Sequence, residues 1–292
     1  MASTSSIVLH ARAAPARGSM DDHRAKYLAP SKAVSSNDDG ALTSASGEEM
    51  KPKHAVVFFD CDDCLYKNDW RTANVITAKI ESYTTERLGL PHGAAYELYK
   101  KHGTCLRGLQ NEALLHGEEE LEEFLEYAHD IPLEIERDER LREMLLRMKT
   151  PKWVFTASVA AHAKRCLEAL GIEDLFEGII DVRAVEWETK HSTKAYEAAM
   201  RIAGVDDPAA CLFLDDSTSN MKTARVMGWT NILVGTHARD GGHEIECEHA
   251  DHIISTVHDF EALMPEHFHP SVDGVEDAVP NGTKVQAAVP AP

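Results

Sequence analysis

Residues 54–66 read His54-Ala55-Val56-Val57-Phe58-Phe59-Asp60-Cys61-Asp62-Asp63-Cys64-Leu65-Tyr66, a short apolar run that ends in acidic residues. The β-branched and aromatic residues predict a buried strand of the kind found in parallel sheets. In open α/β sheets, ligands bind beyond the carboxyl ends of the strands. We therefore expect Asp60 and Asp62 to project into a cleft, where one carboxylate can attack phosphorus and the other can transfer a proton.

A hydroxyl group that could bind phosphate is expected at the end of a second strand. The apolar run of residues 152–155 is followed by Thr156 and Ala157 and then by a helical pattern. Such a turn offers a hydroxyl group and free backbone N–H groups to a phosphoryl oxygen. Because Thr and Ser also cap helices in many proteins, this segment alone does not decide between structure and function.

Charged residues mark two later segments. Lys190 and Lys194 stand near the start of a predicted helix, where lysines oppose the helix dipole and therefore suggest a function. The apolar run of residues 210–214 ends in Asp215 and Asp216 and opens another helix. The alternative for every segment is ordinary structure, such as a strand with an acidic turn. The common placement of all four at predicted strand or helix ends favours one shared site.

These segments, in this order, resemble the motifs of the haloacid dehalogenase-like hydrolases. The resemblance covers about residues 54–264, with Asp60-Cys61-Asp62 similar to the first motif, Thr156 to the second, Lys190 to the third and Asp215-Asp216-Ser217 to the fourth. A closer likeness is to the pyrimidine 5′-nucleotidase-like branch, through residues 62–66, 99–109 and 194–199. Two departures are Cys64, where Thr or Val is commoner, and His191, where Pro is frequent. The second departure keeps Lys194 as an alternative to Lys190.

The resemblance implies a mechanism in two steps. Asp60 would attack phosphorus and form an aspartyl phosphate, while Asp62 would serve first as an acid and then as a base. Thr156 and Ala157 would hold a phosphoryl oxygen, and Lys190 would offset the negative charge. Positioning and electrostatics supply most of the acceleration in phosphoryl transfer.

The resemblance also implies a Mg²⁺ cofactor. Its expected ligands are Asp60, the backbone carbonyl of Asp62, and the pair Asp215 and Asp216. Asp216 aligns with the family's usual direct ligand, so Asp215 is expected to act through water. A divalent cation also fits the physics of the site, because neighbouring carboxylates repel each other.

The expected fold is a doubly wound, Rossmann-like parallel sheet with an inserted helical cap, because strands and helices alternate after residue 152. Helical patterns near residues 70–88, 95–103 and 118–128 would form the cap, which in the family closes over the active site. The expected organisation is a disordered segment over 1–50, an α/β hydrolase core over 51–68 and 136–265, a cap over 69–135 and a disordered tail over 266–292.

Composition limits the function classes. The net charge of −19 over 292 residues argues against nucleic-acid and anionic membrane partners, and no apolar run is long enough to span a membrane. The six cysteines are expected to be buried thiols, with redox use of Cys61 and Cys64 as the alternative. The expected location is the cytoplasm, or the chloroplast if residues 1–20 act as a transit peptide. The sequence does not indicate an oligomeric state.

The predicted partner is therefore a small phosphomonoester, most simply a pyrimidine nucleoside 5′-monophosphate. Arg107, in the predicted cap, could bind the base or a phosphate, or it could form a structural ion pair. The alternatives are a phosphosugar or phosphoglycolate phosphatase and a non-catalytic binding protein. Dehalogenases of this fold lack the second acid, so Asp62 favours phosphate chemistry.

Overall fold

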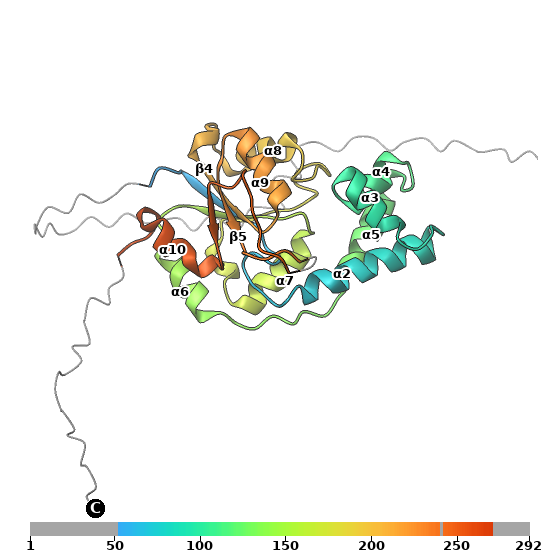
Figure 1. Cartoon of the computed structure of the whole chain (residues 1–292), viewed down its shortest axis with the longest axis horizontal. Coiled ribbons are helices and arrows are strands. Elements are labelled where there is room, and N and C mark those ends of the chain that lie inside the picture. Colours follow the sequence, from blue (N-terminus) through green and yellow to red (C-terminus); the bar gives the residue numbers. More distant parts are fainter. Residues whose placement is uncertain (1–51, 240–241, 271–292) are drawn as a thin grey trace, which may run out of the picture.

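The computed structural model describes residues 52–239 and 242–270. The predictions for residues 1–50 and for residues 271–292 therefore lie outside the described residues. Within the described ranges, six parallel strands form one sheet in the order β3-β2-β1-β4-β5-β6 (Figure 1). They are β1 (Val56–Phe59), β2 (Lys152–Phe155), β3 (Ile179–Ile180), β4 (Cys211–Asp215), β5 (Thr230–Val234) and β6 (His252–Ile254).

The strand order reverses at β1, which lies between β2 and β4. The chain runs outward from β1 toward β3 in one direction and from β4 toward β6 in the other. This is the predicted doubly wound, Rossmann-like arrangement, and it places the expected ligand crevice beyond the ends of β1 and β4. Phe59 pairs with Leu214 in this register, so the residues that follow each strand lie side by side.

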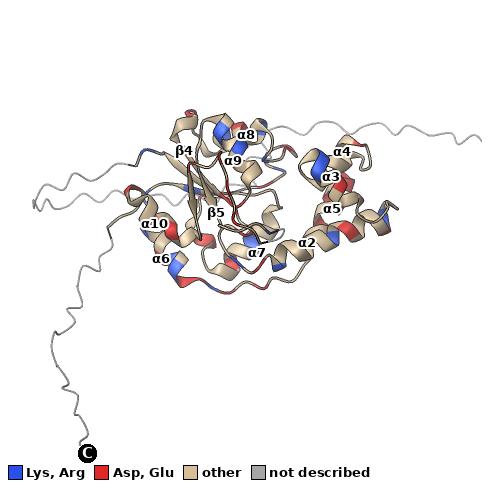
Figure 2. Ribbon diagram, in the orientation of Figure 1, with Lys and Arg blue, Asp and Glu red and all other residues tan. Residues whose placement is uncertain are grey.

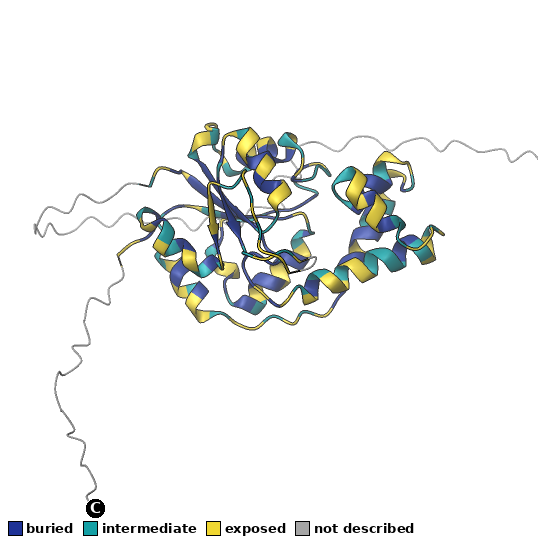
Figure 3. Ribbon diagram, viewed as in Figure 1, coloured by how far each residue is buried: buried dark blue, intermediate teal, exposed yellow. Residues whose placement is uncertain are grey.

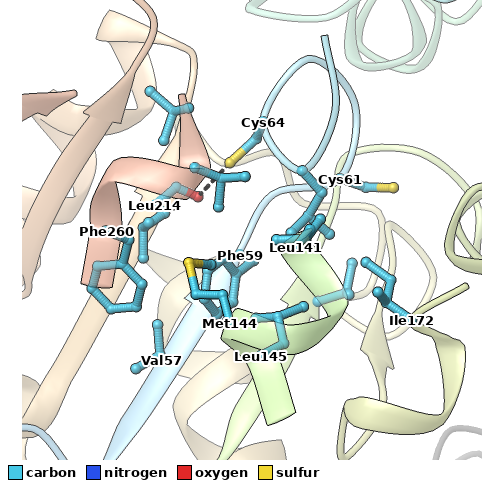
Figure 4. Close-up of a cluster of buried hydrophobic side chains, with 14 of the residues drawn as sticks. Val57, Phe59, Cys61, Cys64, Leu141, Met144, Leu145, Ile172, Leu214 and Phe260 are labelled. Atoms are coloured by element: carbon cyan, nitrogen blue, oxygen red, sulfur yellow. Dashed lines mark hydrogen bonds between the residues drawn. The ribbon is translucent and has the colours of Figure 1, made fainter. Parts of the chain in front are cut away.

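Helices cover both faces of the sheet. Successive residues of β1 point to opposite faces, so they pack against different helices. Val57 and Phe59 pack with one set of helices, α6 (Glu139–Arg147), α7 (Ala160–Leu170) and α10 (Phe260–Leu263). Figure 4 shows part of this cluster around Phe59, Leu145 and Phe260. Val56 and Phe58 pack on the other face with α8 (Thr193–Ala203) and α9 (Thr218–Met227). The central strands are therefore buried on both faces (Figure 3).

The helical cap is inserted between β1 and β2 and lies to one side of the sheet (Figure 1). It consists of α2 (Arg71–Ser82), which continues into a π-helical turn (Tyr83–Arg87), and of α3 (Ala94–His102), α4 (Cys105–Asn111) and α5 (Gly117–His129). These helices share a hydrophobic cluster around Tyr83, Leu109 and Phe124. Val159 and Val182 from the α/β part belong to the same cluster. The cap therefore packs against the sheet domain through apolar contacts.

The two chain segments that connect the cap to the sheet are bonded to each other. The side chain of Asn68 donates to the backbone carbonyl of Glu134 at 3.4 Å, and Arg71 pairs with the Glu134 carboxylate at 2.7 Å. Farther out, Arg183 of the α/β part forms an ion pair with Glu122 of α5. No helix in the described ranges is long and apolar enough to cross a membrane.

The described chain extends into the segment that the sequence assigned to the C-terminal tail. His267 and Phe268 are buried, and the Phe268 ring packs against Phe260 with 5.3 Å between ring centroids. His267 also bonds the Thr150 hydroxyl at 2.8 Å. Residue 266 is thus too early a start for the tail, because these two aromatic side chains fill space beside the sheet.

Candidate active site

A buried lysine joins the ends of β1 and β4. Asp60 directly follows β1, and Asp215 is the last residue of β4. The Lys190 ammonium lies 2.5 Å from Oδ1 of Asp60 and 2.7 Å from Oδ2 of Asp215. All three residues are buried. The register of the two strands therefore brings two predicted carboxylates to one cation, although Lys190 lies far from both in the sequence.

The apolar surroundings of Lys190 strengthen these contacts. Its Nζ lies 5.3 Å from the centre of the Phe155 ring and 5.4 Å from that of Phe213. Burial by itself would lower the pKa of Lys190, but the Asp215 and Asp60 charges raise that pKa above its ordinary value. Burial raises the pKa of Asp60, against the opposing charge of Lys190. The site is therefore a charge cluster whose members depend on one another.

Asp215 and Asp216 differ sharply in their hydrogen bonding. Asp215 is fully buried and accepts bonds from Lys190, from the backbone N–H of Ser217 and from the Asn220 amide. Asp216 is half-buried, and within the described residues no hydrogen bond or ion pair is found for its carboxylate. Burial and the neighbouring charges of Asp215 and Asp63 raise the pKa of Asp216 to about 7. Of the two carboxylates, Asp216 is therefore the one whose oxygens are more available to a ligand.

A cation site fits this arrangement. One carboxylate oxygen each of Asp60, Asp215 and Asp216 lies within 4.8 Å of the others. Carboxylate oxygens are the ligands that Mg²⁺ prefers, and a divalent charge here would relieve the repulsion that raises the pKa of Asp216. Three of the four expected Mg²⁺ ligands are thus gathered at one point.

Asp62 lies in a different hydrogen-bonding environment from Asp60. Its Oδ1 accepts bonds from the Tyr66 hydroxyl at 2.6 Å and from Nε2 of His162 at 2.8 Å, and its Oδ2 accepts one from the Ser158 hydroxyl at 3.0 Å. Burial opposes the charge, but these three donors lower the pKa of Asp62 below its ordinary value. The carboxylate is therefore oriented by residues of three segments.

The sequence reasoning did not identify His162 as part of the site. His162 lies on α7, six residues after Thr156, and only 1% of its surface is exposed. Burial lowers its pKa, but the hydrogen bonds and charge of Asp62 and Cys166 raise that pKa to about 10. The available signal was a histidine on the apolar face of the predicted helix that follows the second motif.

Thr156 and Ala157 lie at the end of β2. Thr156 is buried, and its hydroxyl accepts a hydrogen bond from the backbone N–H of Ser158 at 3.0 Å. Ala157 is exposed at this turn. The same turn supplies the Ser158 hydroxyl to Asp62, so the second predicted segment is tied directly to the first.

Lys194 lies apart from the charge cluster. Its side chain is 73% exposed and its Nζ lies 3.5 Å from Glu188. Arg107 of the cap reaches the same carboxylate at 3.7 Å. Both cations line a hollow of about 690 Å³ between α3, α4 and the segment before α8, together with Lys100, Lys101 and His191. Figure 2 shows the basic residues of α3 in blue.

The cysteines of the described ranges are free thiols. Cys64 donates to the backbone carbonyl of Leu214 at 3.5 Å, which is the dashed line in Figure 4. Burial raises the pKa of Cys64, as expected for an inert packing residue. The Cys61–Cys64 pair therefore does not form a disulfide, and each thiol has a separate environment.

Comparison with known proteins places this geometry in a family. A sequence model described as haloacid dehalogenase-like hydrolase matches residues 54–228, more than half of the chain. The chain belongs to this family. In this haloacid dehalogenase-like hydrolase, the matched range runs from the start of the first motif to the end of α9.

Two solved structures and one curated protein resemble the hydrolase. β-Phosphoglucomutase from Clostridium difficile is 17% identical, with a TM-score of 0.53 over 73% of this chain and 97% of that chain. L-2-haloacid dehalogenase from Xanthobacter autotrophicus is 14% identical, with a TM-score of 0.47 over 73% and 98%. Phosphate metabolism protein 8 of Saccharomyces cerevisiae is 29% identical over 198 residues, 62% of this chain and 62% of that protein. The chain thus spans less than two thirds of this curated relative.

Proposed function

We propose that this hydrolase is a Mg²⁺-dependent phosphatase that cleaves phosphomonoesters through a phosphate covalently bound to Asp60. The observation that carries the proposal is the buried Lys190, which holds Asp60 and Asp215 side by side at the ends of β1 and β4. A carboxylate fixed beside a buried cation is oriented for attack, and the same cation offsets the charge that phosphate brings.

The first chemical step would proceed as follows. An oxygen of Asp60 forms a bond to phosphorus, and the bond between phosphorus and the ester oxygen breaks. Asp62 takes up a proton from solvent before this step, because its three donors favour the carboxylate, and it gives that proton to the departing oxygen, so that a neutral alcohol leaves. Thr156 and the turn around Ala157 lie at the neighbouring strand end, where backbone N–H groups can hold a phosphoryl oxygen.

The second step would release phosphate. Asp62, now a carboxylate, takes a proton from water, and the water oxygen attacks phosphorus while the bond to Asp60 breaks. Asp60, Asp216 and the backbone carbonyl of Asp62 would hold Mg²⁺ directly, and Asp215 would act through water. When bound, Mg²⁺ would polarise a phosphoryl oxygen and stabilise the charge that develops on it. No hydrogen bond to the carboxylate of Asp216 is found among the described residues, which supports a direct role for this residue.

The substrate class is proposed to be nucleoside 5′-monophosphates, with pyrimidines preferred. Support comes from the likeness of residues 99–109 to the nucleotidase branch and from the hollow that Arg107 lines. A guanidinium group can stack on a base or bind an anion. The second candidate is a phosphosugar or phosphoglycolate phosphatase. The name of the phosphoglucomutase neighbour, which refers to a sugar phosphate, is the reason to test it.

The test is phosphate release from UMP, CMP, AMP, phosphoglycolate and a hexose phosphate, each with Mg²⁺ and with EDTA. We expect EDTA to abolish turnover and Mg²⁺ to restore it, with a nucleotide giving the highest kcat/KM. Arg107→Ala should raise KM more than it lowers kcat, whereas Lys101→Ala, beside it in the hollow, should change neither much. A tenfold lead for a phosphosugar or phosphoglycolate would overturn the nucleotidase proposal but not the phosphatase proposal.

A further inference from the structure

The two oxygens of Asp62 are occupied unequally. Oδ1 accepts two hydrogen bonds, from Tyr66 and His162, and Oδ2 accepts one, from Ser158. Within the described residues, Oδ2 is thus the oxygen with more room for a further proton. Because a proton on the carboxyl group must be aimed at the ester oxygen, the group that fixes the rotation of Asp62 matters for the proposed first step.

His162 is the most rigid of the three donors. A hydroxyl group can rotate and donate elsewhere, whereas an imidazole donates along a fixed direction of its ring. The His162 ring is buried on α7 and stands beside the His129 ring at the end of α5, with 5.2 Å between centroids. It therefore has little freedom to turn.

The donor atom of His162 is also unambiguous. Its Nδ1 is buried, and no hydrogen-bond partner for it is found among the described residues. Its Nε2 lies 2.8 Å from Asp62 and 3.6 Å from the Cys166 sulfur. A neutral ring would keep its proton on Nε2, since a proton on Nδ1 would be buried without an acceptor. A charged ring has a proton on Nε2 as well, so Nε2 donates in either form.

We propose that His162 is a positioning residue for the acid–base reaction of Asp62. By donating from Nε2 to Oδ1, it fixes the carboxyl group so that Oδ2 carries the proton that passes to the departing ester oxygen. The Tyr66 hydroxyl also donates to Oδ1, and the Ser158 hydroxyl donates to Oδ2. This inference rests on the proposed function, and nothing in the family motifs assigns the role to His162.

The test compares two esters with different needs for a proton. p-Nitrophenyl phosphate releases a stable phenolate, whereas an alkyl phosphate such as a nucleoside 5′-monophosphate releases an alkoxide that must be protonated. His162→Leu should lower kcat/KM for the alkyl ester at least ~10-fold more than for the nitrophenyl ester, because kcat/KM reports the first chemical step. His162→Gln, which keeps an N–H donor, should restore part of this ratio.

Controls separate positioning from folding. His129→Leu removes the ring that stands beside His162 but leaves the bond from Nε2 to Asp62, so it should change the ratio between the two esters much less than His162→Leu does. Circular dichroism and the melting temperature verify that each variant is folded. A parallel loss on both esters in His162→Leu would overturn the proposal.

Asp62→Asn separates this inference from the proposed function. It should lower the alkyl-to-nitrophenyl ratio at least as much as His162→Leu does. If it lowers the ratio and His162→Leu does not, His162 has no positioning role and the phosphatase mechanism stands. If Asp62→Asn leaves the ratio unchanged, Asp62 is not the acid, and both ideas are wrong in that step.

Discussion

Lys190 precedes α8, yet its ammonium group binds carboxylates at the ends of β1 and β4. Lys190→Met keeps the length of the side chain and removes its charge, leaving Asp60 and Asp215 buried together. We expect kcat to fall by at least ~10²-fold, since preorganised charge is lost, and the melting temperature to fall as well. Lys194→Met is the matched control, because Lys194 is exposed, and its kcat should stay within about threefold of the wild type.

A covalent role for Asp60 has a direct test. Asp60→Asn is nearly isosteric but gives a poor nucleophile, so we expect a loss of about 10³-fold or more in kcat with the fold retained. Acid-quenched enzyme, incubated with ³²P-labelled substrate, should carry label in the wild type and none in the variant. Substantial turnover by folded Asp60→Asn would show that another group attacks phosphorus.

The sequence located these residues better than it located their partners. Each predicted motif residue ended a strand or began a turn, and such positions can be recognised from local pattern alone. The bonds from His162, Tyr66 and Ser158 to Asp62 depend on how α7 and the β1 loop meet, which no local pattern shows. The structure places the ammonium of Lys190, and not that of Lys194, beside the two carboxylates, and the sequence does not show the direction of either side chain.

At the level of elements, Gly103 fixes the approach of the cap to the segment before α8. It ends α3 with a φ of +87°, and a Cβ there would stand 2.2 Å from Nδ1 of His191. Gly93 begins the same helix with a φ of +86°, but a Cβ there would meet nothing within 4 Å. Both positions have a positive φ that strains a side chain, and they differ in the contact that a Cβ would make.

This pair provides a controlled experiment. Gly93→Ala should cost about 1–2 kcal/mol of stability from backbone strain and leave kcat/KM nearly unchanged. Gly103→Ala should add a clash that moves His191, next to Lys190, and so lower kcat/KM by at least ~10-fold. Removing the ring by His191→Ala should recover most of that extra loss. Equal effects of the two glycine variants would show that the cap tolerates the contact.

Helices with a sustained apolar pattern were predicted, whereas two short elements were not. The helices over most of 70–88 and 118–128 follow sustained apolar patterns, and the structure contains them. Helix α4 has only seven residues and was not recognised, although Thr104 caps it by accepting a bond from Arg107. Strand β6 was missed because it is three residues long and mostly exposed at the sheet edge.

For the whole molecule, buried histidines link stability to pH. Burial and the neighbouring charges of His267 and Lys53 lower the pKa of His54 to about 4, against the opposing charge of Glu266. The Nε2 atom of His54 also forms a hydrogen bond with the Thr230 hydroxyl. The unfolded chain takes up a proton near pH 6.5 and the folded one only near pH 4, so stability is lost as the pH falls through that window. The loss is on the order of 3 kcal/mol.

His54→Gln should remove this loss. Asp63 and Asp216 have raised pKa values of about 6 and 7, so their contributions run in the opposite direction between pH 4 and 7. The informative quantity is therefore the difference in unfolding free energy between wild type and His54→Gln, measured by urea denaturation. This difference should fall between pH 7 and pH 4, whereas for exposed His252→Gln it should stay constant. A pH-independent difference for His54→Gln would contradict the linkage.

The bonds from Asn68 and Arg71 to Glu134 tie the beginning of the cap to its end. The two ends of the insertion therefore leave the sheet domain at one place, as the two ends of a short loop would. We propose that the cap can therefore be enlarged or exchanged at these two ends while the order of the strands is kept. Under the proposed function, the cap residues that would select the substrate and the sheet residues that would cleave it could then change independently of each other.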